Sequence, residues 1–272
     1  MEPTPRYIGV SMLGRGRPLF HAVVRGANAP GVLGDLAAKM GRAGFNILLM
    51  NECSPPESRE STATFFIEGD EGKTEAELEG AIAKSPHSLS VTVRKSESKL
   101  LVDSFPFPLM YFPSGRGVLF PQSGIMAMFQ DIVRMFGTGG ESILFRAGWT
   151  VGWQGAGDVA KIVGEEAMAK EPDLFAGLYA ALGWGRMHVV GAAPDLSSFT
   201  MELEEGFEGT GAKSPAPVCH FTRGLVAGSS ERVLSRAVTC AETECVAAGD
   251  PHCLFTVTVK AGRPSRSGSS WS

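Results

Sequence analysis

Four residues in the last quarter of the chain have the side chains and the spacing of a metal site. Glu242 and Cys245 are three residues apart, Cys253 follows eight residues later, and Cys219 precedes them. The turn Gly249-Asp250-Pro251 lies between two expected strands, so residues on both sides of it can point at one ion. Thiolates with one harder ligand form the tetrahedral site that Zn²⁺ prefers. The pattern therefore predicts a zinc site, and its alternative is a buried hairpin whose cysteines act as small apolar side chains.

Other residues near this cluster have a less direct part in the prediction. His220 and His252 are each next to a candidate ligand and are alternative ligands. Cys240 lies two residues before Glu242 on the same expected strand, and we expect it to be a core residue. Three thiolates and a carboxylate carry more negative charge than a divalent ion neutralises, so backbone N–H groups should surround the site.

Length and composition describe an ordinary globular chain. The 272 residues predict two domains, and the 43% hydrophobic and 20% charged residues exclude a wholly disordered chain. The net charge of −4 gives no general attraction to nucleic acid or to an anionic membrane. Five cysteines, an odd number, in a chain without an export signal argue against a disulfide framework. We expect a soluble, cytoplasmic protein with no membrane partner.

The first part of the chain has a βαββαβ order of expected elements. A helix from Pro30 to Arg42 is predicted by apolar residues at helical spacing, and Gly44 follows its end. The complete order is strand 19–25, helix 30–42, an apolar run 46–51, strand 61–68, helix 74–83 and strand 89–93.

The loop Asn28-Ala-Pro-Gly31 and the run Ala43-Gly-Phe-Asn-Ile47 in this part resemble an ACT domain. The resemblance implies a ferredoxin-like fold in which the loop from Asn28 to Gly31 cradles an amino acid at a dimer interface. The aspartate usual in that family is Asn28 here, so the alternative is a pairing module without a ligand.

The second part changes character after a polar linker. We expect helices in 105–136, from near Glu141 to Trp153 and in 173–182, followed by strands at 186–190, 199–205 and 254–259. Gly148 and Gly152, four residues apart, permit close helix packing. The predicted fold class is α+β, in these parts: 1–17 N-terminal segment, 18–95 ACT-like domain, 96–106 linker, 107–260 second domain, 261–272 disordered tail.

The end of the second part carries a more specific resemblance. The motifs PVC at 217–219 and ETECVAAGDPHC at 242–253, with Gly224 and Gly228, are similar to the 4-vinyl reductase, or hydrocarbon-binding, domain family. That domain also forms the sensory half of bacterial activators of phenol and xylene catabolism. The resemblance implies that Cys219, Glu242, Cys245 and Cys253 hold a closed, structural zinc site.

The same resemblance implies an apolar cavity for a small aromatic ligand. Leu203 stands where phenol sensors carry a tryptophan, which disfavours phenol and leaves a more apolar or larger ligand. His188 is an alternative polar contact. Ordinary core packing is the alternative for each candidate lining residue: Trp149, Trp153, Phe175, Tyr179, Leu203 and Phe207.

Three functions fit these features. The preferred one is a small-molecule-binding regulatory protein, a homodimer that acts on a separate output protein, because the chain lacks a GxxxxGK[ST] motif and a basic recognition helix. An enzyme is not expected, since no nicotinamide-binding glycine pattern and no nucleophile–base pair is found. The resemblance leaves two alternatives: a tetrapyrrole-binding carrier or accessory to a vinyl reductase, and a structural dimeric adaptor with a permanently bound lipid.

Overall fold

The chain divides into two compact units. In the computed structural model, the boundary falls between Val118 and Leu119, later than the domain start at 107 expected from the sequence. Each unit has its own sheet and its own apolar core. The residues that the structure describes are 8–14, 16–52, 57–103, 105, 108–112, 115–170 and 172–264.

The first unit is built on a four-stranded antiparallel sheet with two helices. The strands lie in the order β3-β4-β2-β5, and the chain visits them as βαββαβ, the ferredoxin-like arrangement expected from the sequence. Its elements are β2 (Leu19–Ala27), α1 (Val32–Arg42), β3 (Phe45–Glu52), β4 (Glu60–Gly69), α2 (Glu75–Ala83) and β5 (Ser88–Lys95).

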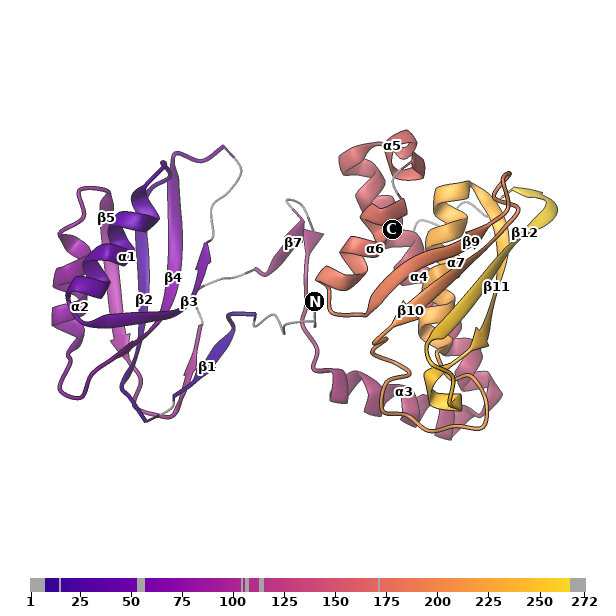
Figure 1. The fold of residues 1–272 in the computed structure, drawn as a ribbon, viewed down its shortest axis with the longest axis horizontal. Coiled ribbons are helices and arrows are strands. Elements are labelled where there is room, and N and C mark those ends of the chain that lie inside the picture. The colour runs from indigo at the N-terminus through magenta and orange to yellow at the C-terminus, as the bar shows by residue number, and fades with distance from the viewer. Residues whose placement is uncertain are drawn as a thin grey trace. The chain divides into compact units, whose positions relative to one another are not determined.

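Alternation along β2 gives this sheet two apolar faces. Phe20, Ala22 and Val24 are buried in the core with residues of α1 and α2, which cover one face (Figure 1). Successive side chains of a strand point to opposite faces, so Leu19 and His21 lie on the other face. Both are buried there, which means that this second face also needs a cover.

Two short strands provide that cover, in segments where the sequence predicted none. β1 (Ser11–Leu13) pairs with β6 (Leu100–Val102), so the expected N-terminal segment and the expected linker form a two-stranded ribbon. Leu101 of this ribbon packs with Leu19 and Phe66 of the sheet. A second small ribbon, β7 (Met110–Phe112) with β8 (Gly115–Arg116), follows before the unit ends.

The second unit has a four-stranded antiparallel sheet in the order β11-β12-β10-β9, with α4 and α7 packed beside it (Figure 1). β12 extends to Pro264, so the tail expected from residue 261 begins inside this strand, and residues 265–272 lie outside the described part of the chain. The elements are α3 (Gln122–Phe136), α4 (Thr138–Val163), α5 (Glu165–Lys170), α6 (Pro172–Ala181), β9 (Arg186–Ala192), β10 (Ser198–Glu204), α7 (His220–Leu234), β11 (Arg236–Glu244), the 3₁₀ helix η1 (Val246–Ala248) and β12 (Cys253–Pro264).

The helices α4 and α7 approach each other so closely that only glycine fits between them. A Cβ atom at Gly148 would overlap the backbone carbonyl of Phe221, and one at Gly224 would overlap the carbonyl of Phe145. The close packing predicted from the glycine spacing is present, and it fixes α7 against α4. Four glycines make this contact: Gly148, Gly152, Gly224 and Gly228. Within the described ranges, no helix is both long enough and apolar enough to cross a membrane.

Candidate metal centre and ligand cavity

The fold brings the four predicted metal ligands to one point. Cys219 directly precedes α7, Glu242 lies near the end of β11, Cys245 precedes η1, and Cys253 begins β12. One ligand atom from each residue lies within 4.8 Å of the other three. The three cysteines are buried, and the cluster could hold a metal ion.

The sulfur positions fit tetrahedral coordination. The Sγ atom of Cys219 lies 3.9 Å from that of Cys245 and 3.8 Å from that of Cys253, and the Cys245 and Cys253 sulfurs are 4.0 Å apart. Sulfurs placed tetrahedrally about 2.3 Å from one ion stand about 3.8 Å apart. The sulfurs are much too far apart for a disulfide bond, whose length is about 2.05 Å. The donor set therefore matches a thiolate-rich tetrahedral site.

The carboxylate of Glu242 leaves one oxygen free for a cation. Its Oε2 atom accepts a hydrogen bond from the backbone N–H of Cys219 at 2.9 Å. Its Oε1 atom is buried and has no hydrogen-bond partner among the described residues. A buried oxygen without a donor is unfavourable, and a metal ion beside it would remove that penalty.

Without an ion, these thiols hold their protons. Its contact with Cys253, followed by burial and the charge of Glu242, raises the pKa of Cys219, and the same contact lowers the pKa of Cys253. Burial raises the pKa of Cys245 to about 11. Binding a metal ion must therefore release protons from the cluster.

Local backbone groups offset part of the negative charge. The N–H of Val246 points at the Cys253 sulfur at 3.5 Å, and the positive end of α7 begins at Cys219. The turn after η1 holds this geometry: Gly249 has a φ of 106°, and the Asp250 carboxylate accepts the N–H of Cys245 at 2.8 Å. The sequence motif Gly-Asp-Pro thus serves to orient a ligand residue.

The neighbouring candidates lie outside the cluster. The Nε2 atom of His220 is 3.9 Å from Glu141, and His252 lies between Glu202 and Glu244 at 3.7 and 3.6 Å. Cys240 is buried on β11, and burial raises its pKa to about 12. It is a core residue.

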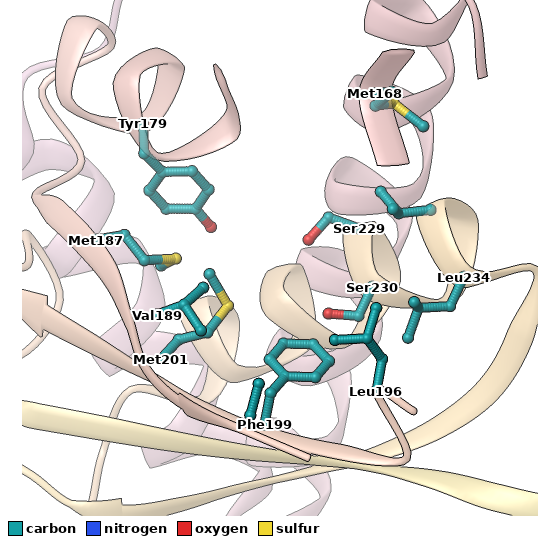
Figure 2. Close-up of a pocket in the computed structure, with 12 residues that line it drawn as sticks. Met168, Tyr179, Met187, Val189, Leu196, Phe199, Met201, Ser229, Ser230 and Leu234 are labelled. Carbon is teal, nitrogen blue, oxygen red and sulfur yellow. The ribbon is translucent and has the colours of Figure 1, made fainter. Parts of the chain in front are cut away.

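A cavity of about 330 Å³ lies in the second unit between the sheet and the helices. Its wall comes from α5, α6 and α7 on one side and from β9 and β10 on the other (Figure 2). None of the side chains known to line it is charged, and the only polar ones are three hydroxyl groups. The lining residues are Met168, Tyr179, Met187, Val189, Ala192, Leu196, Phe199, Met201, Ser229, Ser230, Val233 and Leu234.

Among the six pocket candidates from the sequence, Tyr179 lines this cavity. Phe175 belongs to α6, but its side chain lies outside the described part of the structure. Trp149 and Trp153 stack on each other with ring centroids 5.2 Å apart. The indole N–H of Trp149 donates to Glu231 at 3.1 Å, so this polar group is already engaged.

The two remaining candidates pack in the core. Leu203 is buried on β10 opposite Cys253 on β12. Phe207 contacts the rings of Phe129, Trp184 and Phe221. The alternative contact His188 is exposed on β9, opposite Glu202 on β10.

In the first unit, Asn28 and Gly31 border a separate hollow or its adjoining turn. Asn28 is one of the residues that line this hollow at the start of α1, and its side-chain amide donates to the carbonyl of Ser58 at 2.9 Å. Gly31 has a φ of 86° directly before α1. The amide of Asn28 thus serves to hold two loops together.

Residues 199–259 match the family model of the 4-vinyl reductase domain. The C-terminal region contains a domain of this family. The matched residues include all four members of the metal cluster and part of the cavity wall.

Curated relatives match only a short stretch of the chain. Two uncharacterized proteins of Methanocaldococcus jannaschii are each 44% identical to it over 43 residues, which is 16% of this chain. The match spans only 25% and 24% of their own lengths.

Solved structures of related description also resemble the chain. The phenol-responsive sensory domain of the transcription activator PoxR, with phenol, is 21% identical, with a TM-score of 0.48 over 55% of this chain and 79% of that one. A vinyl-4-reductase family protein of Methanocaldococcus jannaschii is 18% identical, with a TM-score of 0.37 over 54% and 85%. A trafficking protein particle complex subunit 3 from Naegleria fowleri, covalently bound to palmitic acid, is 17% identical, with a TM-score of 0.37 over 51% and 89%.

Proposed function

We propose that the protein is a small-molecule sensor whose 4-vinyl reductase domain binds an apolar or aromatic ligand and contains a structural zinc ion. The observation that carries this proposal is the uncharged cavity of about 330 Å³ within the unit that contains this domain. Ligand sites of small proteins are concave, mostly apolar and supplied with a few polar groups, and this cavity has that character.

The zinc ion would be held by Cys219, Glu242, Cys245 and Cys253. When bound, zinc supplies a fixed tetrahedral link among its ligands and no open position for water or substrate. The free Oε1 atom of Glu242 and the sulfur spacing support this assignment. The link would join the start of α7 to the hairpin of β11 and β12 and would contribute folding free energy.

The helix α7 connects the two sites. Cys219 precedes its first turn, whereas Ser229, Ser230, Val233 and Leu234 of its second half line the cavity. A helix fixed at one end by metal and packed on α4 is a firm wall for a ligand site. Ligand occupancy would then act on the other helices of the wall, where α5 and α6 contribute Met168 and Tyr179.

The first unit would provide pairing. We infer that an ACT-like unit with the βαββαβ topology makes the protein a homodimer, or binds an amino acid at the loop from Asn28 to Gly31. The output would come from a separate protein that regulates transcription, in keeping with the resemblance to the sensory halves of activators.

Native mass spectrometry of freshly purified protein, compared with its denatured mass, tests the whole proposal. We expect a dimer with one zinc ion per chain and an added organic mass that exchanges with added aromatic compounds. A metal-free chain would overturn the zinc assignment. A lipid that does not exchange would indicate a structural adaptor, and a bound tetrapyrrole would indicate a carrier for a reductase.

A further inference from the structure

The hydroxyl group of Tyr179 is the one polar group of the cavity wall without a hydrogen-bond partner among the described residues. The other two hydroxyls are used inside α7: Ser229 donates to the carbonyl of Leu225 at 2.9 Å, and Ser230 to the carbonyl of Val226 at 2.6 Å. Tyr179 is only 6% exposed, so water does not cover its side chain. A buried hydroxyl in this state is unfavourable until an acceptor reaches it.

The ring of Tyr179 is held in place by its neighbours. Its edge-to-face contact with Trp184 places the two ring centroids 5.3 Å apart at 87°. Figure 2 shows the hydroxyl directed away from the backbone of α6 into the space between Met187, Met201 and Ser229. The group is thus presented to the interior of the cavity on a fixed ring, and a ligand does not have to reorganise it.

The hydroxyl can act only as a neutral donor or acceptor. Burial, together with the charges of Glu208 and Cys240, raises the pKa of Tyr179 well above its ordinary value. None of the known lining residues is charged, so a charged ligand group would stay unpaired in an apolar site. The three methionines of the wall adapt to different apolar shapes but offer no strong acceptor for the hydroxyl hydrogen.

We propose that Tyr179 determines ligand specificity by donating a hydrogen bond to an acceptor atom on an uncharged, mainly apolar ligand. The inference rests on the sensor function proposed above and narrows its ligand class to molecules with an apolar body and one acceptor, such as aromatic ketones, aldehydes or ethers. A pure hydrocarbon would fill the same space but would leave the hydroxyl without a partner.

Two probes of nearly equal shape test this inference on the full chain. Acetophenone carries a carbonyl oxygen where α-methylstyrene carries a methylene group. By calorimetric or fluorescence titration, we expect the natural protein to bind acetophenone about 3- to 10-fold more tightly than α-methylstyrene, the ratio that one hydrogen bond supports. Tyr179→Phe should bring the ratio close to one while binding of α-methylstyrene is kept or improved.

The outcomes separate this inference from the function on which it rests. Ser229→Ala is the matched control, since it also removes a hydroxyl of the cavity wall but one already bonded within α7, and the ratio should persist. If both probes bind but the ratio is unchanged in Tyr179→Phe, the role of Tyr179 is wrong while the cavity function stands. If neither probe binds the natural protein, the proposed cavity function itself fails. The comparison of the two probes on the natural protein needs no variant to fold.

Discussion

The two ends of α7 meet two different kinds of site. At its start, three thiols and a carboxylate converge within 4.8 Å, so the geometry is fixed by a few strong directional interactions. In its second half, the helix lines a cavity with apolar side chains contributed by several elements, where many weak contacts replace a few strong ones. The first arrangement suits a permanent structural ion, and the second suits a ligand that enters and leaves.

This difference predicts how each end responds to substitution. Removing one ligand of a closed metal site leaves the remaining charges and donors buried without their ion, so the cost falls on folding. Changing one side chain of an apolar cavity alters the space and a few contacts, so the cost falls on binding. Three substitutions, taken from the largest expected loss of stability to the smallest, test this division.

Cys245→Ser should produce the largest effect. The variant is expected to lose its zinc and more than about 4 kcal/mol of unfolding free energy, because loss of a structural metal is among the most damaging single changes. Metal analysis by mass spectrometry together with denaturant unfolding measures both quantities.

Cys240→Ala is the matched control, because Cys240 is a buried cysteine of the same sheet that lies outside the cluster. It should keep a full complement of zinc. Normal metal content and normal stability in Cys245→Ser would contradict the structural role of the cluster.

The same difference explains why the metal ligands could be predicted from the sequence and the cavity could not. Cysteine and glutamate carry their chemistry in their residue type, and Glu242, Cys245 and Cys253 lie within a short hairpin. The cavity uses methionine, valine and phenylalanine, which occur throughout any core. A usable signal existed in the alternation of β9 and β10, which places Met187 and Val189 beside Phe199 and Met201 on one face. The sequence analysis instead favoured tryptophans, and Trp149 and Trp153 pack against each other.

The first unit shows the same limit. Its βαββαβ order could be predicted because each helix and each long strand has its own periodicity. The ribbon of β1 and β6 could not, since each strand has only three residues and Ser11 pairs with the distant Val102. The reason for this ribbon is the apolar second face of the sheet, at Leu19 and Phe66, which becomes visible only when the sheet is assembled.

Gly148→Ala should produce an intermediate effect, because it acts on the contact that holds α7 between its two sites. The added methyl group overlaps the backbone carbonyl of Phe221, so α4 and α7 must move apart. We expect the unfolding free energy to fall by about 2 to 3 kcal/mol, as overpacking does elsewhere, with zinc retained. Denaturant unfolding and metal analysis provide the two measurements.

Gly155→Ala in the same helix is the control, because no atom lies within 4 Å of its added Cβ. It should be neutral or stabilise the protein by about 0.5 to 1 kcal/mol through helix propensity. Equal stability of the two variants would show that α4 and α7 are packed less closely than the structure has them.

Ala192→Phe should have the smallest effect on stability and a large effect on the ligand. Ala192 is an exposed residue at the end of β9 that lines the cavity, so the added ring can occupy the cavity without displacing the core. We expect the unfolding free energy to change by less than about 0.5 kcal/mol, as for most surface substitutions. Acetophenone should bind about tenfold more weakly or worse, because the ring occupies the space that the probe needs.

Val190→Phe adds the same ring two residues earlier, at an exposed position that is not among the lining residues. Titration of acetophenone into both variants should therefore show weakened binding in Ala192→Phe alone, with full zinc content in each. Equal affinities in the two variants would place the probe outside this cavity. Loss of zinc in Ala192→Phe would show that the two ends of α7 are not independent, because a change made at the ligand end would then have reached the metal end through the helix.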